Sequence, residues 1–278
     1  MTRNPKVLII ILNYRRYDLT IKIINELHSN LDYSNYSIMV VDNCSPDESA
    51  KVLEEKKDSM NFIFYANKNN SGYAAGNNIG IRYGIKNGYD YSWILNNDVE
   101  ILDRDVLKQL ISKAESDTSI ACIGPKVYSS FNKAVPPFCN RPTLWSYSLG
   151  LKQERDYRRT QIDISRRVYC IYGCCVLLRN EAMKEIDCMD ERTFLYDEEV
   201  ILAERLLSKD YSSFYLPTVS VRHNEGSSTR VLTRSRLKMR IKECSKSRNL
   251  YLKDYRHFSA PARWLCLLTR ACIIYIRK

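Results

Sequence analysis

The sequence predicts an α/β fold whose central, mostly parallel sheet is flanked by helices. Three observations support this class. Apolar runs alternate with segments of helical periodicity over residues 1–128. The apolar runs are continuous and rich in β-branched residues, as in strands covered on both faces. At 278 residues, the chain is long enough to bury a sizeable core.

The first half of the chain supplies five expected strands and four expected helices. The strands are residues 6–12, 36–42, 62–66, 91–95 and 120–128. The helices are residues 17–29, a segment that begins near Ser45 and Pro46, residues 74–85, and a segment that ends at Ser116. In the first helix, Leu19, Ile23 and Leu27 recur every four residues, which is helical spacing. Proline after Ser45 suits the first turn of a helix.

The second half is less regular. Residues 129–167 lose periodicity, and we expect a long excursion there that is mobile or binds a ligand. Residues 168–178 predict one strand with Gly173 inside it, and a helix follows from Asn180. Residues 199–208 predict another helix, and "SFYL" and "VSVRH" after it predict two more strands.

The net charge of +11 is unevenly placed. Residues 230–256 hold ten Lys and Arg against Glu243 and Asp254, so this segment alone carries +8. A basic segment on a near-neutral body indicates an anionic partner, either a phospholipid membrane or a nucleic acid. The ten cysteines have no metal-ligand spacing and are expected to be reduced, packed thiols of a cytoplasmic protein. We recognise no signal peptide and no run long enough to span a bilayer.

Polar residues follow four of the expected strands directly. They are "LNYRR", "VDNCS", "ANKNNSGYAAGNNIG" and "NNDVE". In sheets of this kind, ligands bind beyond the carboxyl ends of the strands. Each stretch alone also suits a turn or a helix cap, but all four fall at the same expected edge. Asp42 at this edge can accept a hydrogen bond from N3–H of a pyrimidine base.

Two further patterns concern phosphate and metal binding. Gly72, Gly76 and Gly80 are four residues apart, which excludes the G-x-G-x-x-G dinucleotide fingerprint. That spacing instead allows close backbone approach or helix packing on the sheet. Asn96 and Asp98 are two residues apart at a strand end, so we expect them to share a side. Two oxygen ligands suit Mg²⁺ or Mn²⁺ holding a diphosphate, although a polar turn would have the same composition.

A second group of acidic residues precedes a predicted helix. Asp197, Glu198 and Glu199 stand in a row before the apolar periodicity begins. Acids in a first turn commonly interact with the helix dipole, but one of these carboxylates could take a proton from an acceptor hydroxyl. His223 ends a later strand among small polar residues, where a metal or phosphate role is plausible.

The order of these motifs resembles the family 2 glycosyltransferases with a GT-A fold, and most the branch of bacterial rhamnosyl-, galactosyl- and galactofuranosyltransferases of surface polysaccharides. The matching stretches span roughly residues 6–230 and are "ILNYRR", "VVDNCS", "NKNNSGYAAGNNIGI", "ILNNDVE", "GCCVLLRNEA", "FLYDEEVILAERL" and "SVRHNEGSS". The resemblance implies a UDP- or dTDP-linked sugar donor, a divalent Mn²⁺ or Mg²⁺, inversion at the anomeric carbon, and a saccharide acceptor in O-antigen or capsule synthesis.

The resemblance also implies roles for individual residues. The catalytic base would be Glu199, with Glu198 as the alternative, and the metal would be held by Asp98, Asn96 and His223. Nucleotide-sugar contacts would come from Asn13, Tyr14, Arg15, Asp42, Asn43, Asn70, Gly72, Asn77 and Asn97. The sequence departs from the family twice, because Asn96 replaces an aspartate of the metal motif and Glu199 stands where many relatives have aspartate.

The resemblance divides the chain into a glycosyltransferase domain, residues 1–230, and a basic amphipathic helical tail, residues 231–278. Residues 1–128 would bind the nucleotide sugar and residues 129–230 the acceptor. The tail ends in "RWLCLLTRACIIYIRK", which predicts either an interfacial helix on an anionic membrane or a helix packed on the domain. A polyprenyl-linked acceptor on the cytoplasmic face of the membrane would explain an interfacial helix. We expect no nucleic acid as a partner. The oligomeric state stays open.

Three competing classes remain. A sugar-nucleotide pyrophosphorylase would need a glycine- and arginine-containing loop after the first strand, and "LNYRRYDLT" has no glycine. A nucleic-acid-binding protein would explain the basic tail but not the polar strand ends. A non-catalytic relative is compatible with the departures at Asn96 and Glu199.

Overall fold

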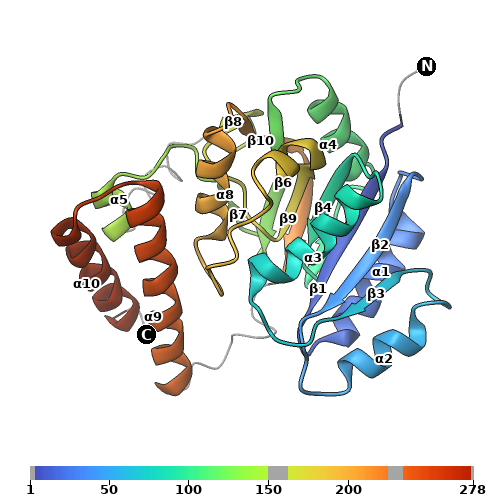
Figure 1. Cartoon of the computed structure of the whole chain (residues 1–278). Helices are drawn as coiled ribbons and strands as arrows, with labels where there is room; N and C mark the ends of the chain where they lie inside the picture. Colours follow the sequence, from blue (N-terminus) through green and yellow to red (C-terminus); the bar gives the residue numbers. More distant parts are fainter. Residues whose placement is uncertain (1–3, 150–161, 225–233, 277–278) are drawn as a thin grey trace.

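A mixed sheet lies at the centre of the computed structural model, which describes residues 4–149, 162–224 and 234–276 (Figure 1). The strand order is β3-β2-β1-β4-β9-β6-β10-β5, with β7 beside β6 and β8 beside β10. The strands are β1 Val7–Asn13, β2 Tyr36–Asp42, β3 Ile63–Ala66, β4 Tyr91–Leu95, β5 Val99–Ile101, β6 Ile120–Ser129, β7 Ala134–Val135, β8 Arg166–Val168, β9 Cys175–Arg179 and β10 Ser212–His223.

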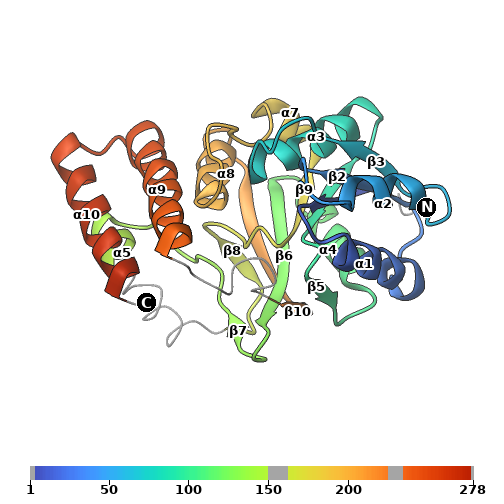
Figure 2. The same cartoon turned by 90° about the horizontal axis from the view of Figure 1, so that it is seen from below.

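Helices cover both faces of the sheet. The helices are α1 Tyr17–Asn30, α2 Ser49–Lys56, α3 Tyr73–Lys86, α4 Val106–Glu115, α5 Leu144–Leu149, α7 Asn180–Glu185, α8 Glu198–Leu207, α9 Arg234–Leu250, the π-helix η1 Tyr251–Tyr255 and α10 Ala260–Ile276. α1 and α4 pack on one face, whereas α3, α7 and α8 pack on the other (Figure 2). The predicted α/β class and its flanking helices are confirmed.

The apolar run of β1 is explained by burial on both sides. Val7, Ile9 and Ile11 pack in the core cluster that contains α1 and α4. Leu8 and Ile10 alternate with them and pack in the cluster that contains α3. All five side chains are fully buried. This strand therefore contributes to two cores at once and fixes the position of its polar end at Asn13.

The structure differs from the sequence-based expectation in three places. The single strand expected over residues 168–178 is wrong, because β8 ends at Val168 and the chain turns at Gly173 before β9 begins. β9 then runs antiparallel between β4 and β6, which makes the sheet mixed. The two strands expected after α8 are one strand, β10. The helix expected near Ser45 begins at Ser49.

The irregular excursion also has structure. Its described residues contain β7, α5 and β8, and residues 150–161 lie outside the described part. The proline-rich stretch from Pro136 to Pro142 lines the cleft described below. That the excursion binds a ligand stays a prediction.

The C-terminal helices pack against the domain. Figures 1 and 2 both place α9 between α8 and α10. Tyr251 of η1 and Cys266 of α10 are fully buried in a cluster with Val200 of α8. The opposite side of α10 is exposed, including Trp264 and Tyr275. Within the described residues, no helix combines the length and the hydropathy that crossing a membrane requires.

Candidate functional site

The carboxyl ends of β1, β2 and β4 meet at one edge of the sheet. Asn13 and Asp42 are partners in the parallel register of β1 and β2, and Asn13 Nδ2 donates to Asp42 Oδ1 at 2.7 Å. The Thr20 hydroxyl donates to Asn13 Oδ1 at 2.9 Å. Asn97 Nδ2, after β4, donates to the same hydroxyl at 3.0 Å. A chain of hydrogen bonds therefore joins the three strand ends.

The Asp42 carboxylate is engaged by its own surroundings. It is 1% exposed, and it accepts hydrogen bonds from Ser45 N–H at 2.9 Å and from the Ser45 hydroxyl at 2.6 Å. Ser45 Oγ in turn accepts the backbone N–H of Arg15 at 2.9 Å. Asp42 thus positions the segment after β1, and its contact with a base stays a prediction. The Tyr14 and Arg15 side chains are exposed beside it and form the accessible part of this edge.

Asn43 holds the loop that leads into α3. Its Nδ2 donates to Asn70 Oδ1 at 3.0 Å and to the Gly72 carbonyl at 3.1 Å. Gly72 has a φ of 90°, a conformation that side-chain-bearing residues rarely adopt. A Cβ at this position would also collide with the Phe194 carbonyl oxygen. Tyr73 N–H donates to that same carbonyl at 2.9 Å, so the loop can touch the segment before α8 only because residue 72 is glycine.

Asn77 does not face the edge. It is fully buried on α3, and its Nδ2 donates to the Tyr73 carbonyl at 3.0 Å. Its Oδ1 has no hydrogen-bond partner among the described residues. In this structure, Asn77 offers no surface for the predicted nucleotide contact. It belongs, with Asn13 and Asn43, to the buried framework of the edge.

The stretch Asn96–Asp98 is a turn and not the end of a strand. β4 ends at Leu95, and Asn97 and Asp98 form the turn that enters β5. Because these residues are not in a strand, the alternation of side chains along a strand does not place Asn96 and Asp98 on one side. Asn97 points inward, where its Nδ2 also donates to the Arg16 carbonyl at 3.3 Å.

Asp98 and His223 nevertheless meet, as the metal prediction requires. Asp98 Oδ1 lies 3.1 Å from His223 Nε2, and the two side chains are 15% and 18% exposed. The antiparallel pairing of β5 with β10 brings them together, because Val99 lies opposite His223. Carboxylate and imidazole ligands fit Mn²⁺, and an amide oxygen from Asn96 fits either Mn²⁺ or Mg²⁺. Among the described residues, no group of three His, Cys, Asp or Glu side chains forms a complete ligand set, so a diphosphate would have to supply further oxygens.

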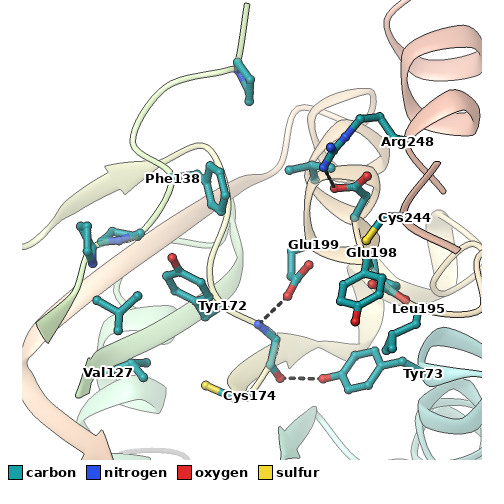
Figure 3. Close-up of a pocket in the computed structure, with 18 of the residues that line it drawn as sticks. Tyr73, Val127, Phe138, Tyr172, Cys174, Leu195, Glu198, Glu199, Cys244 and Arg248 are labelled. Atoms are coloured by element: carbon teal, nitrogen blue, oxygen red, sulfur yellow. Dashed lines mark hydrogen bonds and ion pairs between the residues drawn. The ribbon is translucent and has the colours of Figure 1, made fainter. Parts of the chain in front are cut away.

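A cleft of about 490 Å³ opens beside this pair (Figure 3). Asn96 and His223 line one part of it, and the turn at Gly173 lines another. Glu198 and Glu199 enter it from the first turn of α8, and side chains of α9 and α10 form a further part of its wall. Two of the expected metal ligands, Asn96 and His223, therefore share one space with both candidate bases, and Asp98 contacts His223 beside it.

Glu199 has the geometry of a general base. Its Oε1 accepts the Gly173 N–H at 3.3 Å, and the Tyr73 hydroxyl donates to the Gly173 carbonyl at 2.6 Å (Figure 3). Burial raises the pKa of Glu199, which makes its carboxylate a better proton acceptor. The side chain is only partly buried and lines the cleft.

Glu198 is the less accessible of the two acids. It is 5% exposed, and its Oε1 has no hydrogen-bond partner among the described residues. Burial, and then the charge of Glu199, raise the pKa of Glu198 well above its ordinary value. The geometry therefore favours Glu199 as the base and Glu198 as its buried neighbour.

α9 holds the segment that delivers these acids. Tyr196 and Asp197 precede α8 with φ values of 76° and 64°, and each left-handed residue costs roughly 1–3 kcal/mol. Asp197 Oδ1 lies 3.2 Å from Arg248 Nη2, with both side chains at most 10% exposed. The Ser247 hydroxyl donates to the Leu195 carbonyl at 3.0 Å. The ion pair and the hydrogen bond together stabilise the strained turn.

The tail contributes to the cleft, which the sequence pattern did not predict. Arg240, Cys244 and Arg248 of α9 and Arg270 of α10 all line it. From the sequence, residues 230–256 are interpreted as a basic surface, and residues 263–278 as an interfacial helix or a helix packed on the domain. Arg240, Cys244 and Arg248 are four apart, which places them on one helix face, and that spacing was the available signal.

The family model described as glycosyl transferase family 2 matches residues 8–187, which is more than half of the chain. The chain belongs to glycosyl transferase family 2. This membership fits the order of the strand-end motifs and sets aside the nucleotidyltransferase and nucleic-acid-binding alternatives.

Known relatives and solved structures agree with this family 2 assignment. The N-acetylglucosaminyl-diphospho-decaprenol L-rhamnosyltransferase of Mycobacterium tuberculosis is 35% identical over 112 residues, which cover 39% of this chain and 35% of that protein. A low-salt glycan biosynthesis hexosyltransferase of Haloferax volcanii is 27% identical over 220 residues, covering 75% of this chain and 67% of that protein. The chain thus matches about a third of the length of the mycobacterial relative.

The GT-A fold is confirmed by structural similarity. A mannosyltransferase from Pyrobaculum calidifontis, solved in complex with GDP-Man and Mn²⁺, has a TM-score of 0.65 to this family 2 protein at 14% identity. The superposition covers 97% of this chain and 70% of that one. The likeness concerns the fold alone.

Glu198→Gln is expected to stabilise the protein at neutral pH. The pKa of Glu198 is raised above its ordinary 4.5 in the folded state, so the wild type loses stability as rising pH ionises the buried carboxyl. Glutamine has no such loss, and the difference should disappear well below pH 4.5, where both folded and unfolded carboxyls are protonated.

Thermal unfolding at acid and neutral pH measures this effect. Glu181→Gln removes an exposed carboxyl on α7 and should change the melting temperature little at either pH. A Glu198→Gln variant that is destabilised at neutral pH would contradict the description of Glu198 as a buried, destabilising charge.

Proposed function

We propose that this family 2 protein transfers a sugar from a UDP- or dTDP-linked donor to a lipid-linked saccharide, with inversion at the anomeric carbon. One observation carries the proposal: Glu199 faces the same cleft as Asn96 and His223, beside Asp98. A proton acceptor and a set of cation and diphosphate ligands therefore share one space, as a single displacement requires.

The names of the relatives support the two substrates. The mycobacterial relative is named for an N-acetylglucosaminyl-diphospho-decaprenol acceptor, and the archaeal one for glycan biosynthesis. The mannosyltransferase was solved with a nucleotide sugar and Mn²⁺. We extend these properties to the present chain and propose a role in cell-surface polysaccharide synthesis, such as O-antigen or capsule.

The proposed reaction is one displacement. The acceptor hydroxyl attacks the anomeric carbon, and Glu199 takes its proton as the new bond forms. The bond from the anomeric carbon to the diphosphate oxygen breaks at the same time, and the nucleoside diphosphate leaves. Because attack and departure occur on opposite faces of the sugar, the configuration inverts. Partial burial of Glu199 favours this role, since it raises the basicity of the carboxylate.

Asp98, His223 and Asn96 are the residues that we propose as holders of Mn²⁺ or Mg²⁺. When bound, such a cation neutralises charge on the diphosphate. Asn96 in place of a second carboxylate lowers the negative charge of the site by one unit. The exposed Tyr14 and Arg15 at the sheet edge are proposed to contact the nucleotide.

We further propose that α10 rests on the cytoplasmic face of an anionic membrane, as a peripheral contact. The helix has two different sides. Cys266 is buried, whereas Trp264, Leu268 and Tyr275, spaced by four and seven residues, are 66%, 46% and 63% exposed. An exposed apolar face with aromatic residues, next to a segment of charge +8, suits a surface of anionic phospholipid.

Replacing Trp264 and Leu268 by alanine should weaken binding to vesicles that contain phosphatidylglycerol by about tenfold or more, since each large apolar side chain contributes roughly 1.5–3 kcal/mol when buried. Co-sedimentation with these vesicles provides the measurement. Phe131→Ala removes an apolar side chain that is 81% exposed outside the tail and is the matched control. Equal losses in both variants, or no binding by the wild type, would refute the membrane contact.

Glu199→Gln should lower the transfer rate by about 10²–10⁴-fold, the usual contribution of a general base. Donor binding should persist, because the amide keeps the shape of the side chain. Turnover assays and calorimetric donor titrations separate the two effects. Glu198→Gln tests the alternative base in the same assays, and loss of transfer in that variant with retention in Glu199→Gln would reverse the assignment.

Asp98→Ala should abolish the enhancement of donor binding by Mn²⁺ while the fold survives, because it removes the only carboxylate among the proposed ligands. Calorimetric titration of a screened UDP- or dTDP-sugar, with and without Mn²⁺, gives the comparison. Glu100→Gln neutralises a carboxylate of β5, two residues after Asp98, that pairs with Arg222, and it should keep the enhancement. Undiminished Mn²⁺ dependence in Asp98→Ala would exclude this metal site. Hydrolysis of the donor by the wild type would exclude a non-catalytic role.

A further inference from the structure

The tail brings cationic side chains to the catalytic cleft. Arg240 and Arg248 are eight residues apart, which places them on one face of α9. Arg270 belongs to α10. All three line the cleft that contains Glu198 and Glu199. The proposed membrane contact of α10 does not use them, because Trp264 and Leu268 point outward on that helix.

One of these arginines has a structural task. Arg248 pairs with Asp197 at the start of α8. Figure 3 shows Arg248 on the same side of the cleft as Glu198. Arg240 is exposed, and its guanidinium lies 5.8 Å from the centre of the Tyr196 ring. Arg240 and Arg270 place two further guanidinium groups on the tail side of the cleft.

The donor does not account for this charge. Its diphosphate is expected near Asp98 and His223, which belong to the sheet edge, whereas Arg240 and Arg270 belong to the tail wall. Guanidinium groups bind phosphate oxygens with geometry and charge that match a diphosphate. A second anion is therefore expected in the acceptor.

From the outer side of α10 into the cleft, the chemical groups of the protein follow the order of the parts of such an acceptor. Apolar side chains lie on the outer side of α10, arginines line the cleft, and Glu199 lies inside it. A lipid-diphosphate saccharide has the same sequence of parts: hydrocarbon, diphosphate and sugar. We propose that Arg240 and Arg270 bind the diphosphate of a lipid-linked saccharide acceptor, an inference that rests on the proposed function.

The test compares two soluble acceptors with the same saccharide and the same short alkyl chain, one with a diphosphate between them and one without. Arg240→Gln/Arg270→Gln should raise KM for the diphosphate acceptor by about tenfold to a hundredfold. KM for the alkyl glycoside, KM for the donor and kcat should change little. Arg240→Gln alone should give a smaller rise of KM for the diphosphate acceptor. Because Arg240 is exposed, we expect this single variant to fold.

Lys242→Gln is the matched control, because Lys242 is an exposed cation on α9 outside the described cleft lining. It should leave all constants unchanged. An equal rise of KM for both acceptors would show a general structural effect. A rise of KM for the donor alone would assign the arginines to the donor diphosphate. A rise of KM for the diphosphate acceptor in Lys242→Gln would show a non-specific effect of positive charge on the tail. Each of these results overturns the proposal.

A second readout does not depend on turnover. Inorganic pyrophosphate, titrated by calorimetry without divalent cation, should bind Arg240→Gln/Arg270→Gln about tenfold or more weakly than the wild type. Lys242→Gln should bind like the wild type. If the wild type transfers sugar to both acceptors with equal KM, this inference fails while the function stands. If the wild type transfers no sugar, the proposed glycosyltransferase function fails. Unchanged pyrophosphate affinity in Arg240→Gln/Arg270→Gln would overturn the proposed diphosphate site in either case.

Discussion

The contact between Gly72 and Phe194 determines how the two parts of the site face each other. Gly72 ends the loop that Asn43 ties to the strand edge, and Phe194 lies in the segment that leads to α8. Tyr73 N–H donates to the Phe194 carbonyl at 2.9 Å, in a space that leaves no room for a Cβ on residue 72. The position of Glu198 and Glu199 relative to the strand edge thus depends in part on one backbone hydrogen bond and on the absence of a side chain at residue 72.

The same segment is held from its other side by the tail. Asp190, at its start, accepts hydrogen bonds from Arg192 and Tyr255, and Asp197, at its end, pairs with Arg248. These contacts offset the repulsion that three consecutive acids would otherwise experience in a partly buried turn. They also help to stabilise the two left-handed residues, Tyr196 and Asp197, that precede α8. The tail is therefore part of the site as well as a surface.

Local pattern was sufficient for β1, β2 and β4, because each contains an apolar run that ends in Asn or Asp or is followed directly by Asn. It failed at residues 168–178, where the apolar run could not reveal that Gly173 turns the chain and reverses its direction. It also could not show that Asn77 faces the interior, since a helix periodicity does not specify what its polar side packs against. The Asp197–Arg248 pair was invisible because 51 residues separate its members. Asp98 and His223 were associated beforehand only through the resemblance of the motif order.

The position of the arginines late in the chain has a consequence for biosynthesis. The strand edge is built from residues before Asp98, so its hydrogen bonds can form while the chain is still being synthesised. The opposite wall of the cleft requires α9 and α10, which emerge only after about 230 residues have been translated. The strand edge that is proposed to bind the donor can therefore form before the wall that is proposed to bind the acceptor. On this proposal, transfer must wait until the last helices complete the cleft.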